Sequence, residues 1–256
     1  MTVEYDGTGY SGWQRQANAM TVQQVIEEKL AALTGESIVI CGASRTDAGV
    51  HAMGQSLHFD THSRIPGEKF SYALNTLLPP DIRIRASTES DMSFHARFSA
   101  VGKRYRYLFY DAPHAGALNR NTHAHCIYPL KDQLMEQCIA DLIGTYDFSA
   151  FAASGSKVRD SVRTIWSARV ERIDHDVAIT VEGSGFLYNM VRIIAGTLRD
   201  VGAGKLAPDV FKRALRSGDR LDLGITAPAH GLTLMEVFYR LPESCSIPVP
   251  DKESLL

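Results

Sequence analysis

The chain has 256 residues, 45% of them hydrophobic, which is enough to bury a core in one large domain or two smaller ones. Its 27 Lys and Arg nearly balance 29 Asp and Glu, so any polyanionic partner must be held by a local basic patch and not by overall charge. The chain has no apolar run long enough for a membrane span and no signal-peptide pattern at its start, and its four scattered cysteines form no CxxC pair. These features predict a cytoplasmic protein with reduced, mostly packed thiols.

The first part of the chain predicts alternating helices and strands. Thr21 and Gln24 form a capping box at the start of a helix with one apolar face, and Gly35 ends that helix. A second, shorter helix is expected to end before Pro79. The helices are expected at 22–34 and 70–78, and the strands at 37–41, 55–61 and 81–85.

The same reasoning extends to the second part of the chain. Strands are predicted at 103–110, 161–173, 176–184 and 232–240, and helices at 131–144, 187–202 and 208–218. Together these elements indicate an α+β fold with two halves, each a mixed, largely antiparallel sheet backed by helices. We expect an N-terminal half at 1–98, a C-terminal half at 99–242 and a tail at 243–256, with a catalytic cleft between the halves.

Two motifs suggest cofactors but have simpler interpretations. "GTGYSG" at 7–12 fits GxGxxG, yet no helix opens at its last glycine, so the glycines are interpreted as turn residues and not as a dinucleotide site. His123 and His125 could face one side of a strand, but no third ligand lies nearby in the sequence, which favours surface or packed histidines over a metal site. We therefore expect no metal and no small-molecule cofactor.

The stretch "CGASRTDAGVHA" places Arg45, Asp47 and His51 in the turn between two predicted strands. On spacing alone, Asp47 could simply brace a tight turn with Gly49 and pair with Arg45. The stretch resembles, however, the most characteristic motif of the TruA family of tRNA pseudouridine synthases. Further blocks similar to that family follow its order over nearly the whole chain: "YDGTGYSGWQRQ", "TVQQVIEEKL", "GQSLHFDT", "FHARFSAVGKRYRY", "YDFSAF", "FLYNMVRIIAGTL" and "AHGLTLMEVFY".

This resemblance implies a pseudouridine synthase fold and a cofactor-free isomerase. The enzyme would break the glycosidic bond of uridine 38, 39 or 40 in the tRNA anticodon stem-loop, turn the uracil and rejoin it through carbon five. It also implies a homodimer. Two departures from the family pattern are visible, because the chain has only three residues before Glu4 and because Ser44 stands where glycine is common.

The resemblance assigns three catalytic residues. Asp47 matches the catalytic aspartate, and a carboxylate can attack the sugar or the base or take a sugar proton. Arg192 matches the arginine that keeps this carboxylate ionised, although it could also be a surface charge on a helix. Tyr105 matches the active-site tyrosine, which could stack on uracil and transfer a proton, whereas its simpler role is a cross-strand aromatic pair.

Other residues are expected to bind the substrate. Arg45 matches the arginine that holds the target nucleotide out of its stack, and Leu232 matches the apolar residue that packs on the base, unless it only fills the core. Lys103 shares a face of its predicted strand with Tyr105. In "SKVRDSVR", the basic residues would contact backbone phosphate or serve as solvated charges; they are Lys157, Arg159 and Arg163.

Two other function classes stay open at this point, an RNA-binding module without activity and a nicotinamide enzyme. An RNA-binding module needs no acid in its basic cleft, because a carboxylate that faces phosphate weakens binding. A nicotinamide enzyme would be stabilised by added nucleotide.

Overall fold

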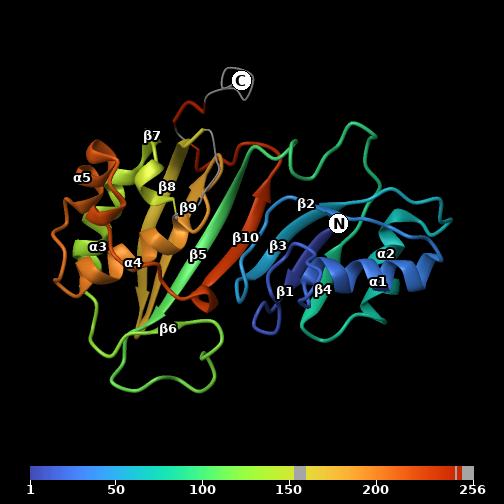
Figure 1. The fold of residues 1–256 in the computed structure, drawn as a ribbon, viewed down its shortest axis with the longest axis horizontal. Coiled ribbons are helices and arrows are strands. Elements are labelled where there is room, and N and C mark those ends of the chain that lie inside the picture. Colours follow the sequence, from blue (N-terminus) through green and yellow to red (C-terminus); the bar gives the residue numbers. More distant parts are fainter. Residues whose placement is uncertain (153–159, 246, 250–256) are drawn as a thin grey trace. The chain divides into compact units, whose positions relative to one another are not determined.

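The computed structural model describes residues 1–152, 160–245 and 247–249, and it divides into two compact units (Figure 1). Unit 1 comprises Met1–Val101 and Thr233–Arg240, and unit 2 comprises Gly102–Leu232 and the residues from Leu241 on. Each unit contains a sheet with helices packed on it, and antiparallel strand pairs predominate in both. The α+β class predicted from the sequence is confirmed.

The sheet of unit 1 has the strand order β4-β1-β3-β10, with β2 paired to β3. The strands are β1 (Thr2–Tyr5), β2 (Cys41–Gly42), β3 (His51–His58), β4 (Ile82–Ala86) and β10 (Leu232–Phe238). Strand β10 runs parallel to β3, whereas the other pairs are antiparallel. This sheet therefore contains both the first and the last strand of the chain.

Helix α1 (Val22–Thr34) of unit 1 has the predicted ends. The Thr21 hydroxyl accepts a hydrogen bond from the N–H of Gln24, and Gly35 ends the helix in the left-handed conformation at φ 76°. Helix α2 (Phe70–Asn75) packs against α1 and β4 and is shorter than the predicted 70–78 (Figure 1). At its end the backbone tightens into i→i+3 bonds, Thr76 N–H to Ala73 and Leu77 N–H to Leu74, and the Asn75 side chain bonds to both the N–H and the carbonyl of Ile84 on β4.

The strand predicted at 37–41 is largely absent, since only Cys41–Gly42 forms β2. The reason lies in helix α1, whose buried side chains bond to this stretch in place of a neighbouring strand. Glu27 accepts a hydrogen bond from the N–H of Ile40, and Gln23 donates one to the Ile40 carbonyl. The apolar pattern of the stretch thus reflects burial against a helix and not strand pairing.

The sheet of unit 2 has the strand order β5-β9-β8-β7, with β6 parallel to β5. The strands are β5 (Gly102–Tyr110), β6 (Ala124–His125), β7 (Gly144–Asp147), β8 (Val162–Ile173) and β9 (Asp176–Gly183). The strands predicted at 161–173 and 176–184 form the antiparallel β8–β9 hairpin. Its turn places Asp174 at a positive φ of 53°.

Three helices complete unit 2: α3 (Asp132–Ile139), α4 (Met190–Gly202) and α5 (Val210–Ser217). Helix α3 packs against β8 and α4, and α4 also packs against β5 (Figure 1). Each is shorter than its predicted range. Helix α4 begins only at Met190, because Asn189 before it adopts a left-handed φ of 61° that a helix cannot include. Helix α3 buries Met135, Cys138 and Ile139.

A buried ion pair ties strand β8 to the end of β5. The carboxylate of Asp111 is almost fully buried and receives both terminal nitrogens of Arg172, at 2.8 and 3.0 Å, together with the N–H of Leu130. Burial raises the pKa of Asp111, but the hydrogen bonds from Arg172 and Leu130 outweigh it, so the pKa ends below its usual 3.8. The ionised pair therefore stabilises the fold above about pH 4, and this contribution is lost as the pH falls through the folded-state pKa.

Replacing Arg172 with Met should lower the free energy of unfolding by about 3 kcal/mol at pH 7, because it leaves a buried carboxylate unpaired. The difference from the parent should shrink in acid, where Asp111 takes up a proton. Urea unfolding at pH 7 and at low pH measures both effects. Arg213→Met removes an exposed pair with Asp209 and should change the stability by less than about 1 kcal/mol. Equal losses in the two variants would contradict the role assigned to the buried pair.

Candidate active site

The turn between β2 and β3 contains the charged motif found in the sequence. Strands β2 and β3 pair antiparallel with Cys41 opposite His58, so residues 43–50 form the connecting loop. Arg45 is exposed and Asp47 is half-buried, while Thr46 between them is buried. Within the loop, the buried Thr46 thus lies between the exposed Arg45 and the half-buried Asp47, which shows how a turn between two strands can hold these two charges.

Buried partners hold both ends of this loop in place. The Gln55 side chain, fully buried on β3, accepts a hydrogen bond from the Ser44 N–H and donates one to the Ser44 carbonyl. Near the other end, the N–H of Gly49 donates to the carbonyl of Tyr10, and Gly49 itself adopts a left-handed φ of 76°. Asp47 therefore sits on a loop whose backbone is fixed on both sides.

Strand β5 of unit 2 carries two of the predicted site residues. Tyr105 is 7% exposed and meets Phe186 edge to face, with ring centroids 5.2 Å apart. Lys103, two residues earlier and on the same face of the strand, is half-buried. The sequence did not single out Phe186. An aromatic partner of this kind fixes the orientation of the Tyr105 ring.

Arg192 lies in the first turn of α4 and is not a freely solvated charge. Its Nε donates to the carbonyl of Ala227 at 2.8 Å, and one terminal nitrogen donates to the Asn189 side chain at 2.9 Å. The positive φ of Asn189 thus serves to bring its amide oxygen to the guanidinium. Two contacts from two different segments orient this cation.

Leu232 is the first residue of β10, and the segment just before it packs against Tyr107 on β5. Leu232 is 6% exposed, and Gly231 before it lies so close to the Tyr107 ring that an added Cβ would stand 2.5 Å from it. The Tyr107 hydroxyl donates to the carbonyl of Pro228, one residue after the Ala227 that bonds to Arg192. Burial raises the pKa of Tyr107, with a smaller opposing effect of Arg192, so its hydroxyl stays protonated.

The predicted site residues therefore fall into two groups. Arg45 and Asp47 share one loop of unit 1, whereas Lys103, Tyr105, Arg192 and Leu232 belong to unit 2. Arg159, with Lys157, lies outside the described residues. Arg163 bonds to the carbonyl of Asp160 within its own strand region.

The two motifs that suggested cofactors have structural roles in the described residues. Helix α1 begins ten residues after Gly12, so "GTGYSG" lacks the helix that a dinucleotide site requires. His125 bonds to the carbonyl of Ala112, and His123 lies near Thr122 and Asp176. The interpretation of both motifs as structural features stays a prediction, and these contacts are consistent with it.

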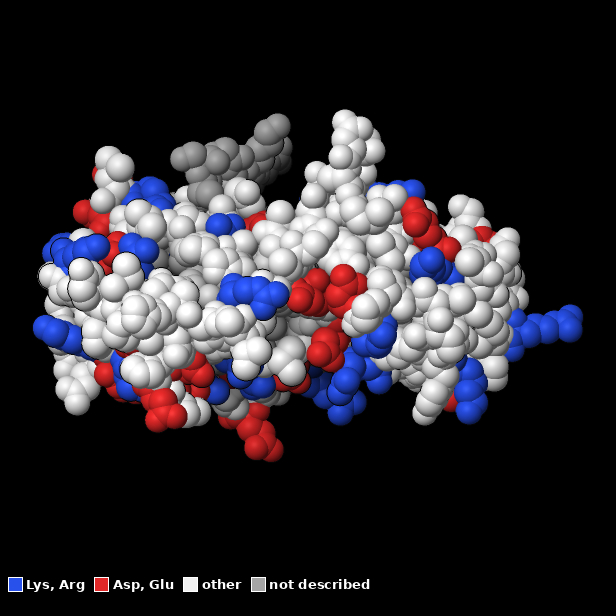
Figure 2. Space-filling view, turned by 90° about the horizontal axis from the view of Figure 1, so that it is seen from below, with Lys and Arg blue, Asp and Glu red and all other residues white. Residues whose placement is uncertain are grey.

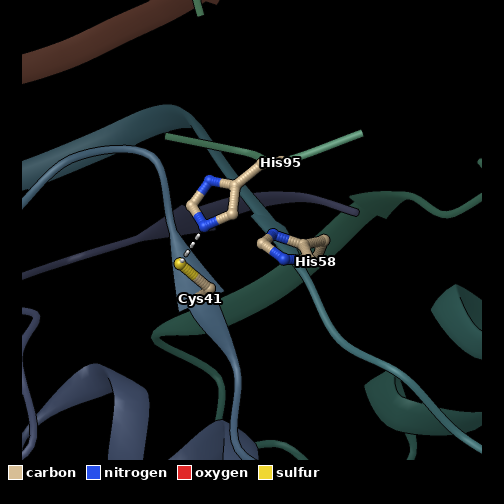
Figure 3. A group of neighbouring side chains, drawn as sticks. All are labelled: Cys41, His58 and His95. Carbon is tan, nitrogen blue, oxygen red and sulfur yellow. Dashed lines mark hydrogen bonds between the residues drawn. The ribbon is translucent and has the colours of Figure 1, made fainter. Parts of the chain in front are cut away.

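A different group of side chains, Cys41, His58 and His95, has its ligand atoms within 4.8 Å of one another (Figure 3). The hydrogen bonds of its two histidines, however, place a proton on the ring nitrogen that a metal would need. The Nδ1 atom of His58 accepts the N–H of Ala96, and that of His95 accepts the N–H groups of Arg97 and Phe98. Each neutral ring must then carry its proton on Nε2, and the Nε2–H of His95 donates to the Cys41 sulfur at 3.6 Å.

In a metal-binding histidine, the ring nitrogen that does not bind the metal donates a hydrogen bond to an acceptor, whereas here that nitrogen accepts one. Burial, followed by the neighbouring His95, lowers the pKa of His58 and keeps that ring neutral. We therefore assign the group of three a structural role, in which it joins β2 and β3 to the 94–99 segment.

The cysteines and the surface charges agree with the composition. All four cysteines are unpaired thiols, and burial raises the pKa of Cys126 to about 11 and of Cys138 to about 12. On the face drawn in Figure 2, Lys and Arg side chains are interspersed with Asp and Glu side chains. None of the helices in the described parts of the chain has the length and apolar character needed to cross a bilayer.

Comparisons with known proteins agree with the motifs. The family profile described as tRNA pseudouridine synthase matches residues 1–99 and 138–240. A protein of Acetivibrio thermocellus named tRNA pseudouridine synthase A is 52% identical over 239 residues, which cover 93% of this chain and 98% of that protein. Proteins of the same name from Ruminiclostridium cellulolyticum and Bacillus subtilis are 51% and 46% identical, again over 93% of this chain and over 98% and 97% of their own lengths.

Proposed function

Because the chain belongs to the tRNA pseudouridine synthase family, we propose that it isomerises uridine to pseudouridine at positions 38, 39 or 40 of the tRNA anticodon stem-loop. The observation that carries this proposal is the Asp47 loop, in which a half-buried carboxylate and the exposed Arg45 lie on a backbone fixed from both sides. The reaction detaches the uracil, turns it and rejoins it through carbon five, and it needs no cofactor.

In this proposal Asp47 is the catalytic carboxylate. It attacks the sugar or the base, or takes a sugar proton as the glycosidic bond breaks, and each of these steps needs an ionised oxygen at a defined position. Arg192 supplies the opposite charge that keeps the carboxylate ionised. Its contacts with Ala227 and Asn189 support this role, because a guanidinium held at two points is oriented before an anion arrives.

Tyr105 is proposed to stack on the target uracil and to move a proton at carbon five. The edge-to-face contact with Phe186 supports this role, since it holds the ring in one orientation. Leu232 would pack on the base, and Arg45 would hold the target nucleotide out of its stack. Lys103 and Arg159 would contact the RNA backbone.

We further propose that the enzyme acts on tRNA in the cytoplasm as a homodimer. With a net charge of −2, the whole chain does not attract RNA, so binding must rest on local groups of Lys and Arg. Reduced cysteines are consistent with a cytoplasmic location.

The test is the release of tritium to water from tRNA labelled at carbon five of uridine, with purified protein and no added cofactor. The proposal expects release, together with pseudouridine at one or more of the three positions when the RNA is mapped. Binding of tRNA without release would instead indicate an RNA-binding module. Release that appears only after a nicotinamide nucleotide is added would indicate a different enzyme class.

A further inference from the structure

The glycine-rich segment near the N-terminus packs directly against the Asp47 loop. At Gly12, φ is +86°, and an added Cβ would lie 2.6 Å from the carbonyl oxygen of Thr46 and 3.1 Å from the carbonyl carbon of Asp47. At Gly7, an added Cβ would lie 2.1 Å from the carbonyl oxygen of Val50. Two glycines of this segment are therefore required because the backbone of the loop approaches too closely for any side chain.

Hydrogen bonds join the same two segments at Thr46. The N–H of Trp13 donates to the Thr46 carbonyl at 3.0 Å, and the hydroxyl groups of Tyr5 and Thr46 lie 2.7 Å apart in a buried position. Tyr5 is 2% exposed and Thr46 is 7% exposed, so bulk water does not compete strongly for this contact. Thr46 is thus held by its side chain and by its main chain.

Tyr5 is itself fixed by the sheet. It is the last residue of β1, where it pairs with Ala52 on β3, and its ring lies 5.9 Å from that of Trp13. The hydroxyl that reaches Thr46 therefore belongs to the rigid part of unit 1. Because Thr46 precedes Asp47 directly, fixing its side chain and its carbonyl limits where the next carboxylate can point.

We propose that the contact of Tyr5, Gly12 and Trp13 with the Asp47 loop positions the reacting carboxylate, with Tyr5 and Thr46 as positioning residues and Gly12 as the point of closest approach. This inference rests on the proposed role of Asp47. Neither Tyr5 nor Thr46 touches the reacting atoms. Their effect is on geometry, and a displacement of a reacting group by about 1 Å can slow a reaction by about a hundredfold.

The test compares Tyr5→Phe, Thr46→Val and Thr46→Ser in tritium release from labelled tRNA. The first two variants should lower kcat about tenfold or more and leave KM and tRNA binding unchanged, since the loop is misplaced only for the chemical step. Thr46→Ser keeps the hydroxyl and should retain most of the turnover. The Tyr5→Phe/Thr46→Val double variant should be no slower than the slower single variant, because both changes break one contact.

A purely structural role would give a different result. The melting temperature would fall in Tyr5→Phe and Thr46→Val while kcat per folded molecule stayed at the parent value, and that outcome would overturn the inference. If Asp47→Asn is inactive and these variants turn over like the parent, only this inference fails. If Asp47→Asn stays active, the proposed function of the loop fails with it.

A backbone test uses two glycines of the same segment. Gly12→Ala should abolish turnover, because the added methyl group pushes on Thr46 and Asp47 and the φ value is strained for alanine. Gly9→Ala is the matched control, since an added Cβ there meets nothing within 4 Å, and its turnover should equal that of the parent. If Gly12→Ala does not fold, the Tyr5 and Thr46 variants decide the question. Folded Gly12→Ala with parental turnover would contradict the proposal.

Discussion

The Asp47→Asn variant should fold and bind tRNA like the parent and form no detectable pseudouridine, a loss of at least about a thousandfold in turnover. Asparagine keeps the size and hydrogen-bonding reach of the side chain but removes its charge and nucleophilicity. Because Asp47 is half-buried on a loop held by the buried Gln55 and by the Trp13 N–H that bonds to Thr46, the exchange should disturb the backbone little. Tritium release and a binding measurement on one preparation check both parts.

A control variant in unit 1 distinguishes the loss of a negative charge from the loss of the catalytic group. Asp60→Asn removes an exposed carboxylate two residues after β3 and should leave turnover unchanged. If Asp47 only braces the turn, its amide variant should lose about 1 kcal/mol of stability and keep its activity in the folded fraction. Turnover of Asp47→Asn within tenfold of the parent would remove Asp47 from the mechanism.

The Tyr105→Phe variant should bind tRNA nearly as tightly as the parent and turn over about a hundredfold more slowly. The phenylalanine ring can still meet Phe186 edge to face and stack on a base, but it has no hydroxyl to move a proton at carbon five. Single-turnover rates and a tRNA dissociation constant, measured side by side, distinguish the two contributions.

Tyr110→Phe is the matched control on the same strand. Its ring lies on the opposite face of β5 and meets His175 at 5.8 Å, outside the proposed site. It should turn over at the parental rate. Equal rates for Tyr105→Phe and the parent would leave Tyr105 with stacking alone, and equal losses in both variants would point to damage to the strand.

The elements that could be predicted are those whose signals are local. The capping box of Thr21 and the left-handed Gly35 define α1 within one turn at each end, and alternation over eight or more residues predicted β8 and β9 as strands. The stretch 37–41 could not be predicted correctly from such signals. Its apolar residues are buried, but its backbone bonds to Glu27 and Gln23 on a helix earlier in the chain.

The pairing of strands that are far apart in the chain could not be predicted from the sequence either. Nothing in the composition of 232–238 indicates that β10 should run parallel to β3, which lies about 180 residues earlier. The two bonds from the Asn75 side chain at the end of α2 to Ile84 on β4 are likewise a contact that no periodicity reports. Periodicity predicts which face is buried and not which partner buries it.

In the candidate site, too, the local motif could be recognised from the sequence and the long-range contacts could not. The motif around Asp47 drew attention to the loop, and the residues assigned to the chemistry came from resemblance to a family. The supports of the loop were missed, because the glycines at 7 and 12 were interpreted only as turn residues. A glycine cluster with no helix opening at its last glycine was the available signal that another backbone approaches closely there.

The contact between the segment 5–13 and the Asp47 loop also determines which part of the chain could be transplanted to another scaffold. A graft of 43–50 alone would leave behind the Trp13 N–H that bonds to Thr46, the Tyr10 carbonyl that accepts from Gly49, and the hydroxyl of Tyr5. The smallest part that could be transplanted is therefore discontinuous. It consists of two segments about 40 residues apart, which are held together by these bonds and by the pairing of β1 with β3.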